Sequence, residues 1–222
     1  MNRLLSVQRV AVAVLPMDQF TGGPAIPGGV RVYMKDIAAS VQKKNGYVVF
    51  WDNGSTERTV ILESPFYERE EIWLDMKTFQ KKRMPALHVW LRPGHGYPYP
   101  SGIRLLKQET EPDTVVTVPL EESAGVIQLL GAYPADRICP RQIQLRVPEG
   151  VEIEGRTLLI RRLSDGKQEE LLIWEENNRS MGLYEMAMPL KEVYSVYDTE
   201  ILMVIQMRAD REGRYTLPVL NK

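Results

Sequence analysis

The chain has 222 residues, of which 44% are hydrophobic and 26% are charged, and its formal net charge is −1 at pH 7. This length fits one large domain or two small ones, and the hydrophobic fraction supports packed cores, which excludes disorder for the bulk of the chain. With 28 basic and 29 acidic residues there is no net positive field to gather phosphates, so we do not expect a dedicated nucleic-acid-binding protein. The single cysteine, Cys139, excludes an intramolecular disulfide and a cysteine-cluster metal site, and we expect it to be a small buried hydrophobic residue.

The N-terminal segment favours a strand over a targeting signal. A signal peptide needs an uninterrupted apolar core, and Gln8 and Arg9 interrupt this one at its centre. Val10, Val12 and Val14 then alternate with small alanines, as in a strand. No apolar run approaches the roughly 18–20 residues of a membrane span. We therefore expect cytoplasmic synthesis without a signal peptide, and no membrane span.

Short β-branched segments separated by turn residues follow along the rest of the chain. Residues 30–35 alternate between apolar and polar side chains, and residues 47–51 form a continuous apolar run typical of a core strand. Asp165-Gly166 is a dipeptide that favours tight hairpin turns, and it joins two arms of similar pattern. The same reasoning predicts strands at residues 59–62, 71–76, 86–91, 103–106, 143–147, 156–160, 170–174 and 201–207.

Helical patterns are short and ambiguous, and they lie at residues 36–39, 77–83 and 120–130. No segment sustains an apolar stripe at helical spacing over three turns. The sequence therefore predicts an all-β chain of two consecutive antiparallel β-sandwich domains with little helix. Residues 94–102 are rich in proline and glycine, and a polar stretch follows at residues 108–113, so we expect domains of residues 1–108 and 109–222.

Turns and core positions in the first half follow a recognisable order. The motifs are an opening strand at 9–15, an Asp-x-x-Thr-Gly turn at 18–22, a strand at 30–34, a Gly-x-x-x-Phe core strand within 44–50, a strand ending in a Ser-Pro-x-Tyr turn at 59–67, and a proline- and tyrosine-rich stretch at 91–100. This half resembles the carboxypeptidase-regulatory-like domain, a prealbumin-type (transthyretin-like) β-sandwich. The resemblance implies a non-catalytic spacer, adhesion module or assembly part. Proteins with this pattern also look similar to accessory components of phage-tail-like contractile injection particles, which would make a released particle a candidate final location.

Residues that could carry chemistry are scattered along the chain. His88 and His95 lack the further ligands that a zinc site needs, and the two Ser-x-x-Lys spacings lack the companion motifs of penicillin-recognising enzymes. There is no phosphate-cradling glycine loop, and the acidic pairs are typical of solvated strand edges. We therefore expect no catalytic residues, no metal and no cofactor, and hence not an enzyme.

Aromatic residues of the first domain are the candidate binding residues. Trp73 and Trp90 fall opposite the apolar rows of their strands, so at least one is expected to face outward, and Tyr97 and Tyr99 lie in the proline-rich loop. Packing in the core or at its edge, a partner surface and a sugar-stacking surface all stay open. The leading hypothesis is a structural or adaptor protein that assembles with other protein subunits. The rival is a carbohydrate-binding or adhesive module that uses these aromatics.

Overall fold

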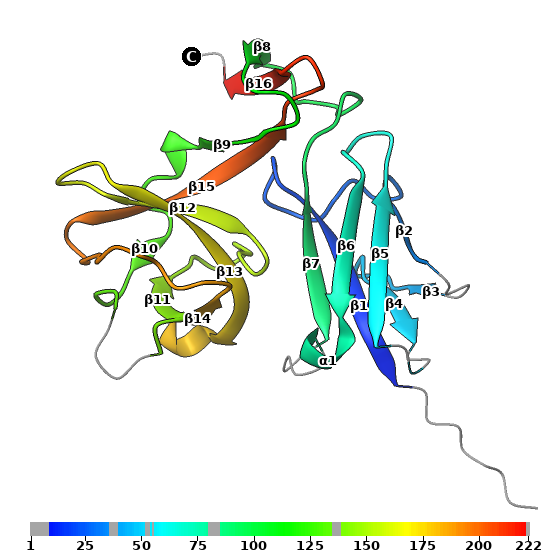
Figure 1. The fold of residues 1–222 in the computed structure, drawn as a ribbon, viewed down its shortest axis with the longest axis horizontal. Helices are drawn as coiled ribbons and strands as arrows, with labels where there is room; N and C mark the ends of the chain where they lie inside the picture. The colour runs from blue at the N-terminus through cyan, green and yellow to red at the C-terminus, as the bar shows by residue number, and fades with distance from the viewer. Residues whose placement is uncertain are drawn as a thin grey trace, which may run out of the picture. The chain divides into compact units, whose positions relative to one another are not determined.

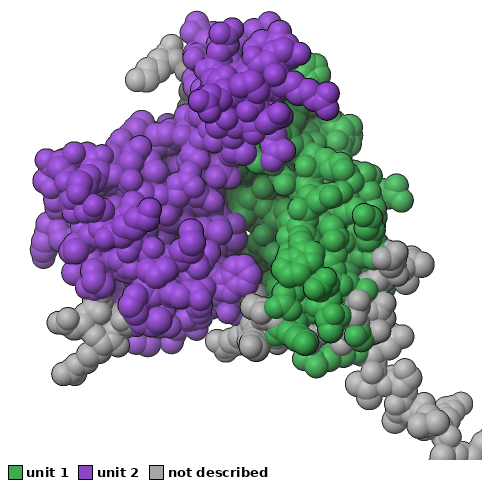
Figure 2. Space-filling model, viewed as in Figure 1, with its two compact units in different colours: residues 1–97 green, residues 98–222 purple. Residues whose placement is uncertain are grey.

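The computed structural model describes residues 9–35, 40–51, 54, 56–79, 85–134 and 139–220. It confirms the all-β prediction: of these described residues, 52% lie in strands and 5% in helices, and none of them belongs to a helix of seven residues or more. None of the helices in these ranges has the length and apolarity that crossing a membrane requires. The chain divides into two compact units, unit 1 of residues 1–97 and unit 2 of residues 98–222 (Figure 2).

Unit 1 contains two sheets (Figure 1). One has the order β3-β4-β1-β7 and the other the order β2-β5-β6. The pairing of β1 with β7 is parallel, whereas the other strand pairs of unit 1 are antiparallel. The elements are β1 (Val10–Asp18), β2 (Arg31–Met34), β3 (Ser40–Gln42), β4 (Val48–Trp51), β5 (Glu57–Glu63), β6 (Glu70–Asp75), α1 (Met76–Phe79) and β7 (Ala86–Leu91).

Apolar residues of β1 and β5 supply much of the core of unit 1. Val12 and Val14 of β1 are fully buried, as expected for alternate residues of a strand that faces a core. Val60 and Leu62 of β5 are buried in the same way. Ala11 of β1 and Ile61 of β5, on the opposite faces of their strands, are buried as well, so these stretches of both strands are covered on both faces.

Unit 2 contains a sheet of seven strands and a separate ribbon of two strands. The large sheet has the order β10-β11-β14-β13-β12-β15-β9, and the ribbon pairs β16 with β8. An isolated β-bridge between Ile127, just before β10, and Ile201 of β15 connects the β10 edge of the large sheet to β15. The elements are β8 (Ile103–Glu109), β9 (Val115–Pro119), η1 (Glu121–Ser123), β10 (Gln128–Leu129), β11 (Gln142–Arg146), β12 (Thr157–Arg162), β13 (Gln168–Asn178), η2 (Arg179–Met181), β14 (Leu183–Met186), β15 (Thr199–Arg208) and β16 (Arg214–Leu220).

The hairpin predicted around Asp165-Gly166 is confirmed, because β12 and β13 pair in antiparallel register with Arg161 opposite Gln168. Gly166 has a φ of 71°, the left-handed conformation that such a turn needs and that glycine adopts without strain. This hairpin is central to the candidate site described below.

Both faces of β15 are buried, which a simple alternating pattern does not predict. Ile201 and Ile205 are buried on one face, and Ile201 belongs to the main core of unit 2. On the other face Leu202 and Val204 form a second buried cluster with Leu159 of β12. A strand buried on both faces is a continuous apolar run, and residues 201–205 fit that pattern.

Two features of the fold, the exposure of Cys139 and the pairing of β8 with β16, were not predicted from the sequence. The prediction that Cys139 is buried is wrong, because its side chain is exposed beside the turn that leads into β11. The strand at residues 103–106, which the sequence analysis assigned to the first domain, belongs to β8 and pairs with β16 of unit 2. Long-range pairing of this kind leaves no local trace in the sequence.

Candidate functional site

Trp73 and Trp90 lie in different sheets of unit 1. The Trp73 side chain is 61% exposed on β6, opposite Thr59 of β5. Trp90 is half-buried on β7, where its backbone is in register with Met17 of β1. The structure therefore does not bring these two aromatic rings together on one sheet surface, and Trp73 is the one that presents an open face.

Tyr97 is 8% exposed and belongs to a buried hydrogen-bond network centred on Asp18. Its hydroxyl donates to Asp18 Oδ2 over 2.6 Å, and the Tyr67 hydroxyl donates to the same oxygen over 2.9 Å. Asp18 Oδ1 accepts from the backbone amides of Phe20 and Thr21. The Tyr97 ring packs edge-on against Tyr67 and Phe20, with centroids 5.5 and 5.8 Å apart. Tyr97 thus holds its own loop in place.

The loop that carries Tyr97 runs very close to the turn after β5. A Cβ added to Gly96 would lie 2.4 Å from the Pro65 carbonyl oxygen, so a side chain there has no room. Burial raises the pKa of Tyr67 above its usual range, which keeps its hydroxyl protonated and able to donate. Tyr99, two residues beyond Tyr97, is half-buried. The proline- and tyrosine-rich segment is therefore packed against the rest of unit 1 at Tyr97.

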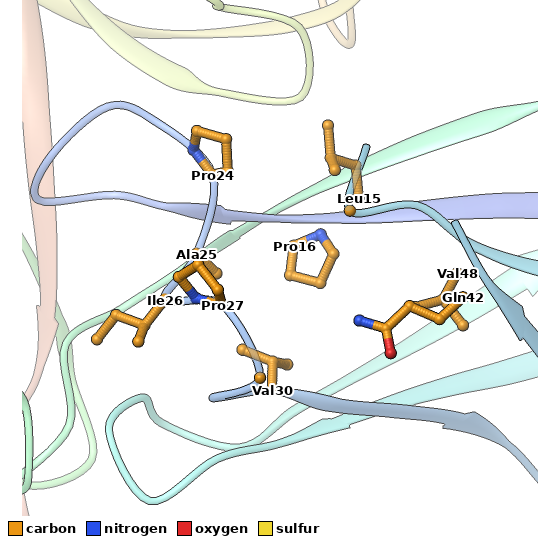
Figure 3. A pocket seen from close by; sticks show the side chains of 11 residues that line it. Leu15, Pro16, Pro24, Ala25, Ile26, Pro27, Val30, Gln42 and Val48 are labelled. Carbon is orange, nitrogen blue, oxygen red and sulfur yellow. The ribbon is translucent and has the colours of Figure 1, made fainter. Parts of the chain in front are cut away.

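A small hollow of about 60 Å³ lies beside β1 of unit 1 (Figure 3). Proline and aliphatic side chains dominate its lining, among them Pro16, Pro24 and Val30, with Gln42 as a polar group at one side. This volume is well below the roughly 300–1,000 Å³ of typical ligand pockets. The hollow does not suit a small-molecule ligand.

The loop between β14 and β15, residues 187–198, is fixed by one carboxylate of unit 2. Glu169 of β13 accepts hydrogen bonds from the backbone amides of Lys191 and Glu192, at 2.8 and 2.9 Å, and from the Tyr194 hydroxyl at 3.1 Å. Tyr194 is fully buried and exchanges backbone hydrogen bonds with Tyr133 in both directions. Burial raises the pKa of Tyr194, with the hydrogen bond to Glu169 acting in the same direction.

Charged residues of the β12–β13 hairpin hold the same loop from its other side. Arg162 donates to the Val193 carbonyl oxygen at 3.0 Å and forms an ion pair with Glu192 at 3.3 Å. Lys167 also pairs with Glu192, and its hydrogen bond lowers the pKa of that carboxyl. Ser164 donates through its amide and its hydroxyl to the Asp198 carboxylate. The loop is therefore rigidly positioned although it has no regular secondary structure.

Large apolar side chains project from this fixed loop and from the adjacent hairpin into solvent. Tyr197 is 98% exposed, Met188 77%, Val193 62% and Leu163 56%. Together with Val196 we call these five residues the apolar rim. Single exposed apolar residues are ordinary, whereas these five all belong to one hydrogen-bonded loop and to the hairpin that holds it.

A groove of about 460 Å³ begins at the Met188 end of the apolar rim. Leu172 and Ala187 are among its apolar lining residues, with Met188 and Pro189 on the loop side. Its lining is completed by Thr157, Gln168, Glu169, Glu170 and Lys191. This volume lies within the roughly 300–1,000 Å³ of typical binding pockets.

The carboxylates beside the groove are engaged in structural hydrogen bonds. Glu169 holds the loop, and Glu170 accepts from the Thr117 hydroxyl of β9. No cluster of three or more histidine, cysteine, aspartate or glutamate side chains suited to a metal ion occurs within the described ranges. Five of the nine lining residues of the groove are polar or charged and four are apolar, so its wall is of mixed polarity.

The apolar rim was not predicted from the sequence. Most of residues 188–198 are apolar or aromatic, but they follow neither an alternating nor a helical period and are interrupted by charged residues and a serine. The signal that could have indicated a surface is the presence of these large apolar side chains at irregular spacing between charged residues. Such residues have no core-facing periodicity to account for them.

No protein-family model matches the chain, and neither the curated proteins nor the solved structures contain a significant match to it. The resemblance of the first half to the carboxypeptidase-regulatory-like domain therefore stays a prediction.

Proposed function

We propose that this chain is a non-catalytic structural or adaptor protein that binds a partner protein through the apolar rim and the adjoining groove of unit 2. The observation that carries the proposal is the exposure of large apolar side chains on a loop that Glu169, Arg162 and Tyr194 hold rigidly. The neutral overall charge and the structural engagement of the groove carboxylates are consistent with it.

Preorganisation is the physical reason why such a loop suits binding. Ordering a flexible side chain or loop on association costs roughly 0.5–1.5 kcal/mol for each immobilised side chain, and a loop that is already fixed avoids much of that cost. Burial of apolar area then contributes about 25 cal/mol per Å². Met188, Val193 and Tyr197, the most exposed members of the rim, are expected to supply most of the binding energy.

The family resemblance of the first half suggests where the partner is found. If the chain is an accessory component of a phage-tail-like contractile particle, the rim would dock onto a neighbouring subunit of that particle. This context rests on the resemblance and is part of the proposal.

The test is comparative affinity capture from the native source with quantitative mass spectrometry. A rim variant, Met188→Ser/Val193→Ser/Tyr197→Ser, is compared with the wild-type chain and with a surface control outside the rim, Met181→Ser on η2, whose side chain is 59% exposed. Because the substituted side chains are exposed, each should change stability by less than about 0.5 kcal/mol, which a thermal melt checks.

We expect a protein that the wild type and the control recover equally, and that the rim variant recovers at least about tenfold less, because hot-spot residues each contribute 1 kcal/mol or more. Equal recovery by all three chains, or no specific protein in any of them, would contradict the proposal.

A second candidate function rests on the open ring of Trp73. An exposed tryptophan on a sheet can stack against the apolar face of a sugar, and Trp73 is flanked on its face by the polar residues Thr59 and Glu71. Screening on a glycan array with the wild type and Trp73→Ala tests this carbohydrate-binding alternative. Binding that disappears in the variant supports it, and an array without signal rules it out.

A further inference from the structure

The β8–β16 ribbon of unit 2 is a two-stranded sheet. β8 and β16 pair in antiparallel register from Ile103 opposite Leu220 to Glu109 opposite Arg214. Within the part of the chain that the structure describes, β16 is the one strand neighbour of β8. Isolated two-stranded sheets are marginally stable in water, and further strands stabilise them. The free edge of β8 is therefore a position where another strand can add.

The register shows which residues of β8 direct their backbone groups to this free edge. The Thr110 amide donates to the Gly213 carbonyl at 2.8 Å, and this pair continues the register of the ribbon. Because antiparallel pairs alternate, Leu106 and Gln108 direct their N–H and C=O groups toward β16 in the same way. Leu105, Lys107 and Glu109 consequently direct theirs away from β16.

These outward residues also carry charges of both signs. The side chains of Lys107 and Glu109 are exposed, and neither forms an ion pair with another described residue. Lys107 lies opposite Thr216, and Glu109 lies opposite Arg214, whose guanidinium bonds instead to Asp210 and Glu212. Leu105 is a further exposed residue of this edge.

We propose that two copies of this chain pair through their β8 edges, antiparallel and about a two-fold axis centred on Gln108. In that register Lys107 of each copy lies opposite Glu109 of the other, so the axis generates two matched ion pairs. A register centred on Lys107 would place two lysines opposite each other, and one centred on Glu109 would place two glutamates opposite each other. A register centred on Leu106 would leave Lys107 opposite Leu105. Charge complementarity therefore selects the partner and the register together.

The pairing produces a four-stranded sheet, β16-β8-β8-β16, across the two copies. It uses the outward backbone groups of β8 in hydrogen bonds, which is how edge strands form specific contacts between chains. A lysine on an edge strand usually discourages such addition, but here the facing glutamate compensates for it. The contact is short, so the self-association is weak and depends on protein concentration.

Sedimentation equilibrium of the full chain over a range of concentrations tests the proposal. The comparison includes wild type, Lys107→Glu, the exchange Lys107→Glu/Glu109→Lys, and the control Lys77→Glu on α1 of unit 1, which makes the same charge change. Lys107→Glu replaces both ion pairs by facing glutamates and should weaken self-association about tenfold or more. The double exchange restores opposite charges and should recover most of the loss, while the control behaves as the wild type.

A wild type that stays monomeric at its highest soluble concentration would overturn the proposal, as would self-association that Lys107→Glu leaves unchanged or that the exchange does not restore. The rim variant of unit 2 separates the two proposals. If it abolishes self-association, the copies meet through the apolar rim and not through β8. Conversely, capture of a partner protein by Lys107→Glu at wild-type level is expected, because the rim is untouched.

Discussion

Both units fix a long loop with a tyrosine hydroxyl that donates to a carboxylate, yet the two loops present opposite surfaces. In unit 1 the carboxylate of Asp18 is buried, and the tyrosine that it holds, Tyr97, packs its ring against Tyr67 and Phe20. In unit 2 Glu169 holds Tyr194 and two loop amides, while Val193 and Tyr197 on either side of that tyrosine remain in solvent.

The difference shows that an aromatic residue in a loop is not by itself evidence of a binding surface. Tyr97 was a candidate binding residue because of its loop, but its hydrogen bond and its ring contacts make it part of the fold. Tyr197 lies three residues after the buried Tyr194, and its exposure follows from the bonds that hold the loop on its other side. Tyr97 itself donates to the anchoring carboxylate and is buried, whereas in unit 2 the residue that donates is Tyr194, and Tyr197 is exposed.

The largest effect is expected from Asp18→Ala. It leaves the Tyr67 and Tyr97 hydroxyls without their acceptor inside the protein, and each unsatisfied buried group costs about 1–3 kcal/mol. We expect a loss of about 3 kcal/mol in the free energy of unfolding, measured by urea denaturation followed by circular dichroism. Tyr97→Phe, which removes one of these bonds and keeps the ring, should cost roughly half as much. A loss below about 1 kcal/mol for Asp18→Ala would mean that the network does not hold this loop.

Glu169→Ala should have a smaller and more local effect, because its hydrogen bonds are exposed or only partly buried and Arg162 and Tyr133 also hold the loop. We expect about 1–2 kcal/mol of lost stability, together with faster amide hydrogen exchange at Lys191 and Glu192, whose acceptor is removed. Glu170→Ala is the matched control, since this neighbour bonds to Thr117 of β9 and does not hold the loop. Unchanged exchange at the two loop amides would show that Arg162 and Tyr133 suffice to fix the loop.

The smallest expected effect is a pH dependence confined to the unit 2 loop and hairpin. The hydrogen bond from Arg162 lowers the pKa of Asp165 from 3.8 to about 2, and the hydrogen bond from Lys167 lowers that of Glu192 from 4.5. Because the folded pKa values lie below the unfolded ones, their stabilisation is complete above about pH 5 and is lost as the pH falls toward 2. The protection factors of the amides of residues 191–193, which correct for the intrinsic pH dependence of exchange, should fall over that range.

Asp165→Asn provides the comparison for this titration, because it removes the carboxyl whose pKa the hydrogen bond from Arg162 lowers to about 2. In this variant the protection factors of the loop amides should change less with pH than they do in the wild type. Identical profiles for the two chains would indicate that Asp165 does not contribute to the attachment of the loop.

Local features of the fold were predictable from the sequence, whereas long-range ones were not. The strand periodicities and the turn at Asp165-Gly166 depend on neighbouring residues, so the hairpin of β12 and β13 was predicted correctly. The burial of Tyr97 depends on Asp18, 79 positions earlier in the chain, and no spacing rule connects the two. The apolar rim depends in the same way on Glu169 and Arg162, which lie in a different hairpin from the loop that they hold. The exposure of Cys139 likewise depends on how its turn is placed in the fold.

The pairing of β8 with β16 has a consequence for how the molecule is made. The first and last strands of unit 2 meet across roughly 100 residues, a separation that makes their pairing a late event in folding. Unit 1 is contiguous in sequence and can fold while unit 2 is still being synthesised. The ribbon is completed only when β16 has left the ribosome, so a nascent chain does not yet present the finished edge through which, in our proposal, two copies recognise each other. Self-association would thereby be delayed until synthesis of the unit is complete.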